Sequence, residues 1–135
     1  ALLDETLGLR YFGGRRAAYR QMLRRFVELH GDDAMRIERA LLAGDRKAAE
    51  RGAHSLKGVA AMIGAAVLQP QVEALEQRIR EGATQVQLAA EFAAFAATLA
   101  RVCAAAVALA DADSTPSGGT PSVAAPDRGP DGRPA

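Results

Sequence analysis

A histidine, a lysine and a glycine lie at one-turn spacing near the middle of the chain. Lys57 follows His54 by three residues and Gly58 follows it by four, so on a helix the three share one face. Imidazole is a biological nucleophile, and a lysine one turn away can neutralise an anion that the imidazole receives. Glycine in a helix interior costs about 0.5–1 kcal/mol relative to alanine, so residue 58 is selected for something other than helix stability. Together the three residues suggest that an anionic group is transferred between proteins. The alternative that the spacing leaves open is a surface histidine near a surface lysine, with a glycine that is there by chance.

This chemistry requires a helix over 45–63 that turns its apolar side inward. Asp45 is a suitable N-cap, and Gly44 and Gly64 mark the two ends. At about 100° per residue, one side of this helix is apolar and predicts the core face: Ala49, Gly52, Ala53, Leu56, Val59, Ala60 and Ile63. The opposite side points to solvent and carries Lys47, Glu50, His54, Lys57, Gly58 and Ala61.

The remaining elements up to residue 110 are patterned as helices too. Apolar residues recur at helical spacing, and Pro70 is the only proline in this part. The pattern predicts helices over 4–12, 15–42, 45–63, 66–82 and 84–109, the second being either one long helix or a kinked pair around Gly31. We therefore expect an all-α fold, an antiparallel four-helix bundle with a short extra N-terminal helix.

The composition separates a folded domain from a tail. Of the six prolines, five lie in 111–135 among glycine, serine and threonine, which predicts a bundle over 1–110 and a disordered tail over 111–135. The net charge of +1 does not call for nucleic acid as a partner. The single cysteine, Cys103, excludes an internal disulfide and a cysteine-based zinc site, and we expect no metal site.

The segment 84–109 poses one alternative, because it is rich in alanine and carries only Glu91 and Arg101 as charges. A membrane span is conceivable, but alanine adds little insertion energy and a central arginine costs about 2.5–3.5 kcal/mol. We predict a bundle helix and no direct membrane insertion.

The run AHSLKGVAAMIGA over 53–65 resembles the signature of histidine-containing phosphotransfer (HPt) domains. These modules occur at the C-terminus of hybrid (unorthodox) sensor histidine kinases and as free phosphorelay proteins. The resemblance covers about 1–110 and includes Ala43-Gly44-Asp45 before the histidine helix and Leu75-Glu76 in the helix after it. The tail has no counterpart in the family pattern.

The resemblance implies that His54 accepts a phosphoryl group from a receiver-domain aspartate and passes it to another receiver aspartate. Lys57 would stabilise the negative charge of the phosphoryl oxygens. Gly58, Ala61 and Lys47 would belong to the partner-binding face. Glu76, 22 residues after the histidine, matches a polar position that hydrogen-bonds the other ring nitrogen. The alternative for Glu76 is a solvated residue that pairs with Arg80 at i+4.

The partners implied are the receiver domains of a hybrid kinase and of a response regulator, with the magnesium ion held by the receiver and no cofactor in this chain. The domain would be a monomeric, cytoplasmic phosphoryl carrier without kinase activity of its own. Whether it is free-standing or forms the cytosolic end of a membrane-bound sensor kinase stays open. Two alternatives stay open: a degenerate bundle that only docks receivers, and a nucleic-acid binder that uses the basic face of Arg16, Arg20 and Arg24.

Overall fold

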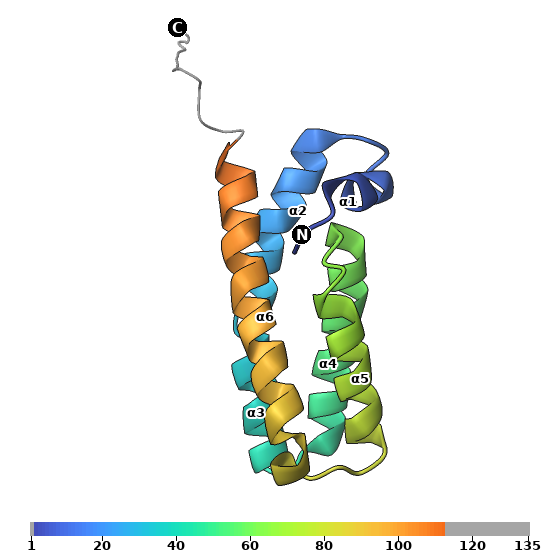
Figure 1. Cartoon of the computed structure of the whole chain (residues 1–135), viewed down its shortest axis with the longest axis vertical. Helices are drawn as coiled ribbons and strands as arrows, with labels where there is room; N and C mark the ends of the chain where they lie inside the picture. Colours follow the sequence, from blue (N-terminus) through green and yellow to red (C-terminus); the bar gives the residue numbers. More distant parts are fainter. Residues whose placement is uncertain (1, 113–135) are drawn as a thin grey trace, which may run out of the picture.

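A computed structural model describes residues 2–112, and this part of the chain contains six α-helices and no strands. In Figure 1, α2 and α3 follow one another along α6, while α4 and α5 form the other side of the bundle, and α1 lies across one end. The helices are α1 (Glu5–Tyr11), α2 (Arg16–His30), α3 (Asp33–Leu42), α4 (Arg46–Ile63), α5 (Leu68–Arg80) and α6 (Gln85–Ala112). The predicted bundle with a short extra N-terminal helix is confirmed.

The segment 15–42 is the kinked pair and not one long helix. It breaks between His30 and Asp33, where α2 ends and α3 begins. Nδ1 of His30 lies 2.7 Å from a carboxylate oxygen of Asp33, and this buried aspartate also pairs with Arg36 at 3.1 Å. The two helices α2 and α3 therefore occupy the place of one helix in the bundle, and both pack against α6.

The last helix extends slightly further than the sequence predicts. Asp111 and Ala112 belong to α6, so the prediction that the tail starts at residue 111 is wrong for these two residues, which continue the helix without interruption. The rest of the predicted tail, 113–135, lies outside the described residues.

The histidine helix α4 has a defined start and end. Its N-cap, Asp45, accepts a hydrogen bond from the backbone of Ala48 at 3.1 Å. At the other end Gly64 takes the left-handed conformation with φ 80°, and a Cβ there would collide with the carbonyl oxygen of Asp4. The face of α4 that packs inward consists of Ala49, Ala53, Leu56, Ala60 and Ile63.

The N-terminal region is tied to the C-terminal end of α4. The backbone N–H of Asp4 donates to the carbonyl of Gly64 at 2.7 Å, and the buried Tyr19 hydroxyl donates to the carbonyl of Ile63 at 2.8 Å. Burial, assisted by the charges of Glu5 and Asp4, raises the pKa of Tyr19 to about 12, so its hydroxyl remains a donor.

We expect Tyr19→Phe to destabilise the bundle by about 1–3 kcal/mol, because the variant leaves the buried carbonyl of Ile63 without its donor. Urea denaturation followed by circular dichroism measures this difference. Tyr11→Phe is the matched control, since Tyr11 is exposed on α1 and its substitution should have no effect. Equal stability of Tyr19→Phe and wild type would show that this hydrogen bond does not hold α4.

The opposite end of α4 is tied to α5. Arg46, the first residue of α4, donates through Nη2 to the carbonyl of Ile79 at 2.7 Å and to that of Ala83 at 2.6 Å. The carbonyl of Ile79 lies in the last turn of α5, where a helix has no intrahelical donors of its own, and that of Ala83 lies in the turn that follows α5. Both ends of the histidine helix are therefore fixed to neighbouring elements.

By length and composition α6 could cross a membrane, a test that a core helix of a soluble protein also passes. In the structure it packs against α2, α3 and α5. Its larger inward side chains, Leu88, Phe95, Leu99 and Val102, are buried in the common core. This packing is that of the bundle helix expected from the sequence.

Candidate functional site

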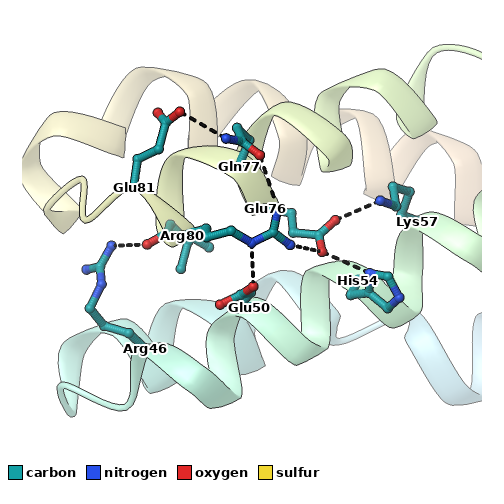
Figure 2. A network of polar contacts seen from close by, with 9 residues as sticks. Arg46, Glu50, His54, Lys57, Glu76, Gln77, Arg80 and Glu81 are labelled. Atoms are coloured by element: carbon teal, nitrogen blue, oxygen red, sulfur yellow. Dashed lines mark hydrogen bonds and ion pairs between the residues drawn. The ribbon is translucent and has the colours of Figure 1, made fainter.

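His54 lies in the middle of α4 on its solvent side, and 70% of its side chain is exposed. Its ring is nevertheless held in place, because Nδ1 lies 2.8 Å from Oε2 of Glu76 on α5. Figure 2 shows the ring's other nitrogen directed away from this contact. Within residues 2–112 no hydrogen bond involves Nε2, which leaves that atom open to a partner.

Glu76 lies at the centre of the site and only 4% of its side chain is exposed. Besides His54 it contacts Lys57, whose Nζ is 2.9 Å from Oε1, and Arg80, whose Nη2 is 2.9 Å from Oε2. The contact with the ring implied by the resemblance and the pairing with Arg80 thus both occur. The alternative of a solvated side chain is wrong, because α4 covers this position of α5.

The carboxyl of Glu76 is ionised in spite of its burial. Burial alone raises its pKa, but the hydrogen bonds from Lys57 and His54 and the charges of the same two residues outweigh it and hold the pKa below the ordinary value of 4.5. An ionised carboxylate can only accept hydrogen bonds, so Nδ1 of His54 is the donor in their contact. This assigns the ring proton to Nδ1.

The other residues predicted for the site occupy different surroundings. Lys57 is half-buried and directed to Glu76, so in this state its charge faces the carboxylate. Gly58 is exposed, and a Cβ built on it would meet nothing within 4 Å. Ala61 is half-buried one turn further along α4, and Lys47 is exposed near the start of the helix.

An open groove runs beside His54 between α4 and α5. It is lined by Lys47, Glu50, Arg51 and Ser55 of α4 and by Arg80 of α5. The assignment of Lys47 to a partner-binding face stays a prediction. Sequence reasoning did not assign Glu50, Arg51 or Ser55 to the site, although Glu50 and Arg51 precede His54 by one helical turn. Between residues 2 and 112 no group of three or more His, Cys, Asp and Glu side chains could hold a metal ion.

The ionised carboxylate of Glu76 makes the stability of the bundle depend on pH. Because the pKa of Glu76 is lower in the folded chain than in the unfolded chain, the carboxylate contributes its full stabilisation at neutral pH. This stabilisation is lost as the pH falls from about 4.5 through the folded pKa. We expect Glu76→Gln to be less stable than wild type by about 1–3 kcal/mol at pH 7, with a smaller difference at pH 3. Urea denaturation at both pH values tests this.

Glu73→Gln serves as the matched control, because Glu73 is an exposed carboxylate on the same helix. It should change stability little at either pH. A difference between wild type and Glu76→Gln that is the same at pH 7 and pH 3 would contradict the charged role of Glu76.

Comparison with known proteins places the chain in a family. The family model described as "Hpt domain" matches residues 21–111, which is 91 of the 135 residues. The match includes α4 and α5 and therefore every candidate site residue. No curated protein and no solved structure matches the chain significantly.

Proposed function

The chain belongs to the Hpt domain family, whose members act in phosphotransfer in two-component signalling, and on that premise we propose that His54 is the residue that carries the phosphoryl group. The donor and the acceptor would be aspartates of two receiver domains, one of a hybrid kinase and one of a response regulator. The observation that carries this proposal is the contact between Nδ1 and Glu76, which leaves Nε2 of an exposed ring open.

The contact with Glu76 makes Nε2 a nucleophile. With the proton on Nδ1, the lone pair of a neutral ring lies on Nε2, on the side directed away from Glu76 in Figure 2. Attack on phosphorus forms the N–P bond at Nε2 and breaks the P–O bond to the aspartate, which leaves as a carboxylate. The ring keeps its Nδ1 proton and becomes cationic, and the carboxylate of Glu76 stabilises this charge. Transfer to the second receiver is the reverse of these steps.

Lys57 is suited to bind the phosphoryl oxygens without leaving Glu76. Its ammonium group has three N–H donors, and its ion pair with Glu76 engages one side of the group. A half-buried lysine that is already oriented loses less conformational freedom when it adds a further acceptor. The receiver would supply the magnesium ion and the carboxylates that hold it, so this chain contributes only the histidine and its neighbours.

The surface around His54 is suited to a protein partner. Gly58 leaves the space next to the ring open on one side, and the groove with Lys47 and Arg51 lies on the other. Within the described residues neither Lys47 nor Arg51 forms an ion pair, so their charge is available to an acidic receiver surface.

The direct test is to phosphorylate a receiver with radiolabelled phosphate, add this chain and follow the label. We expect the chain to acquire label that is stable in alkali and lost in acid, as a phosphohistidine is. A scaffold that only docks receivers would bind them without acquiring label, and this result would overturn the proposal.

A further inference from the structure

The carboxylate that orients His54 is itself held by a residue outside the signature. We propose that Arg80 is a positioning residue of the site, which fixes Glu76 so that Glu76 fixes the imidazole. This inference rests on the proposed role of His54 and adds a component to it.

His54 and Arg80 share one oxygen of Glu76. Oε2 of Glu76 lies 2.8 Å from Nδ1 of His54 and 2.9 Å from Nη2 of Arg80. The terminal torsion of a glutamate has a broad preference, so the side chain alone does not fix the plane of its carboxylate. Arg80 on Oε2 and Lys57 on Oε1 fix that plane from two directions.

Arg80 is fixed in turn by residues of both helices. Its Nε donates to Glu50 on α4 at 2.8 Å, and its Nη1 donates to Gln77 on α5 at 3.1 Å. A guanidinium group is planar and its donors have a fixed geometry, so three acceptors on two helices define its orientation. Figure 2 shows the resulting path, which leads from Glu50 through Arg80 and Glu76 to His54.

Arg80 also bears on the tautomer of the ring. The charged groups around the ring are Lys47, Glu50, Arg51 and Lys57 on α4 and Glu76 and Arg80 on α5. Of the two cations that contact Glu76, Arg80 is the one that binds Oε2, the oxygen that accepts from Nδ1 of His54. Without Arg80, Oε2 can turn away from Nδ1, and the ring can then carry its proton on Nε2, where no lone pair remains to attack phosphorus. Arg80 thus supports both the orientation and the tautomer that the transfer requires.

The test uses Arg80→Gln and two readouts. In NMR spectra of the ¹⁵N-labelled ring, wild type should show the Nδ1–H tautomer, and the variant should show a mixture with the Nε2–H tautomer. Labelling of His54 by phosphoramidate, a small donor that needs no docking, should slow about tenfold.

Arg78→Gln is the matched control. Arg78 lies on the same helix and forms an ion pair with Glu91 of α6 at 2.7 Å, with a side-chain exposure of 41% compared with 51% for Arg80. This control should keep the wild-type tautomer and rate. If Arg80→Gln does not fold, Glu50→Ala removes the acceptor of Nε with Arg80 in place and should change both readouts in the same direction.

A folded Arg80→Gln with the wild-type tautomer and labelling rate would overturn the inference, as would an equal loss in Arg78→Gln. Failure of the proposed function gives a different result, because then either wild type acquires no label from a receiver or His54→Gln acquires as much label as wild type. The tautomer is measured without phosphorylation, so the two failures can be distinguished.

Discussion

His54→Gln is expected to abolish acceptance of acid-labile label from a phosphorylated receiver while the bundle remains folded. Glutamine has no nucleophilic ring nitrogen, so the loss should be complete and not partial. The side chain is exposed on α4, so the substitution creates no cavity, and the free energy of unfolding should fall by no more than about 1 kcal/mol for the lost contact with Glu76. Label transfer and urea denaturation of the same preparation measure both quantities.

The control for this variant is His30→Gln, since the chain has two histidines. His30 is largely buried beside Asp33 and Phe26 at the break between α2 and α3. Its substitution should reduce stability but leave the acceptance of label intact. Label on His54→Gln that disappears in the double variant would identify His30 as an acceptor and contradict the proposed site.

Gly58→Leu should separate stability from function. The position is exposed and a Cβ there meets nothing, so leucine should stabilise α4 by up to about 1 kcal/mol. The same side chain projects one turn from His54 into the surface that a receiver must approach. A displacement of about 1 Å can cost about a hundredfold in rate, and we expect a loss of this size in receiver transfer. Phosphoramidate labelling should be unchanged, because the small donor does not need the cleared surface.

The matched control is Ala104→Leu, which adds the same side chain at an exposed position of α6. The main neighbours of α6 are α2, α3 and α5, so this leucine lies away from the face of α4 that carries His54. It should leave receiver transfer at the wild-type rate. Equal transfer by Gly58→Leu and Ala104→Leu would mean that the open space beside His54 is not used for docking.

Most of the fold could be predicted from helical periodicity and from the residues that end helices. Asp45 and Gly64 place the ends of α4, and both act as the caps that their residue types suggest. The break after His30 could not be settled, because apolar residues continue at helical spacing through Gly31 and glycine alone does not end a helix. The contact between His30 and Asp33 across the break is local in the chain, but it joins two polar side chains and is not encoded in the periodicity of apolar residues.

The site was predicted only in part, for a related reason. The spacing of His54, Lys57 and Gly58 lies within one helix and can be read directly from the chain. The partner of the ring lies on another helix, so Glu76 was reached through resemblance and not through spacing. The pairing of Glu76 with Arg80 is an i+4 contact within α5 and could be read from the spacing. The burial of Glu76 and its contact with Lys57 depend on how α4 and α5 pack, which no local pattern specifies.

The attachment of α4 at both ends has a consequence for the kinetics of partner exchange. Arg46 joins one end to α5, and Ile63 and Gly64 join the other to Tyr19 and Asp4. A helix fixed in this way is already in its binding conformation, so association does not need to order it and most of the interface energy remains for affinity. Receiver binding should therefore follow simple bimolecular kinetics without a slow isomerisation phase. Its heat-capacity change should correspond only to the surface buried between the two proteins, with no contribution from folding of α4.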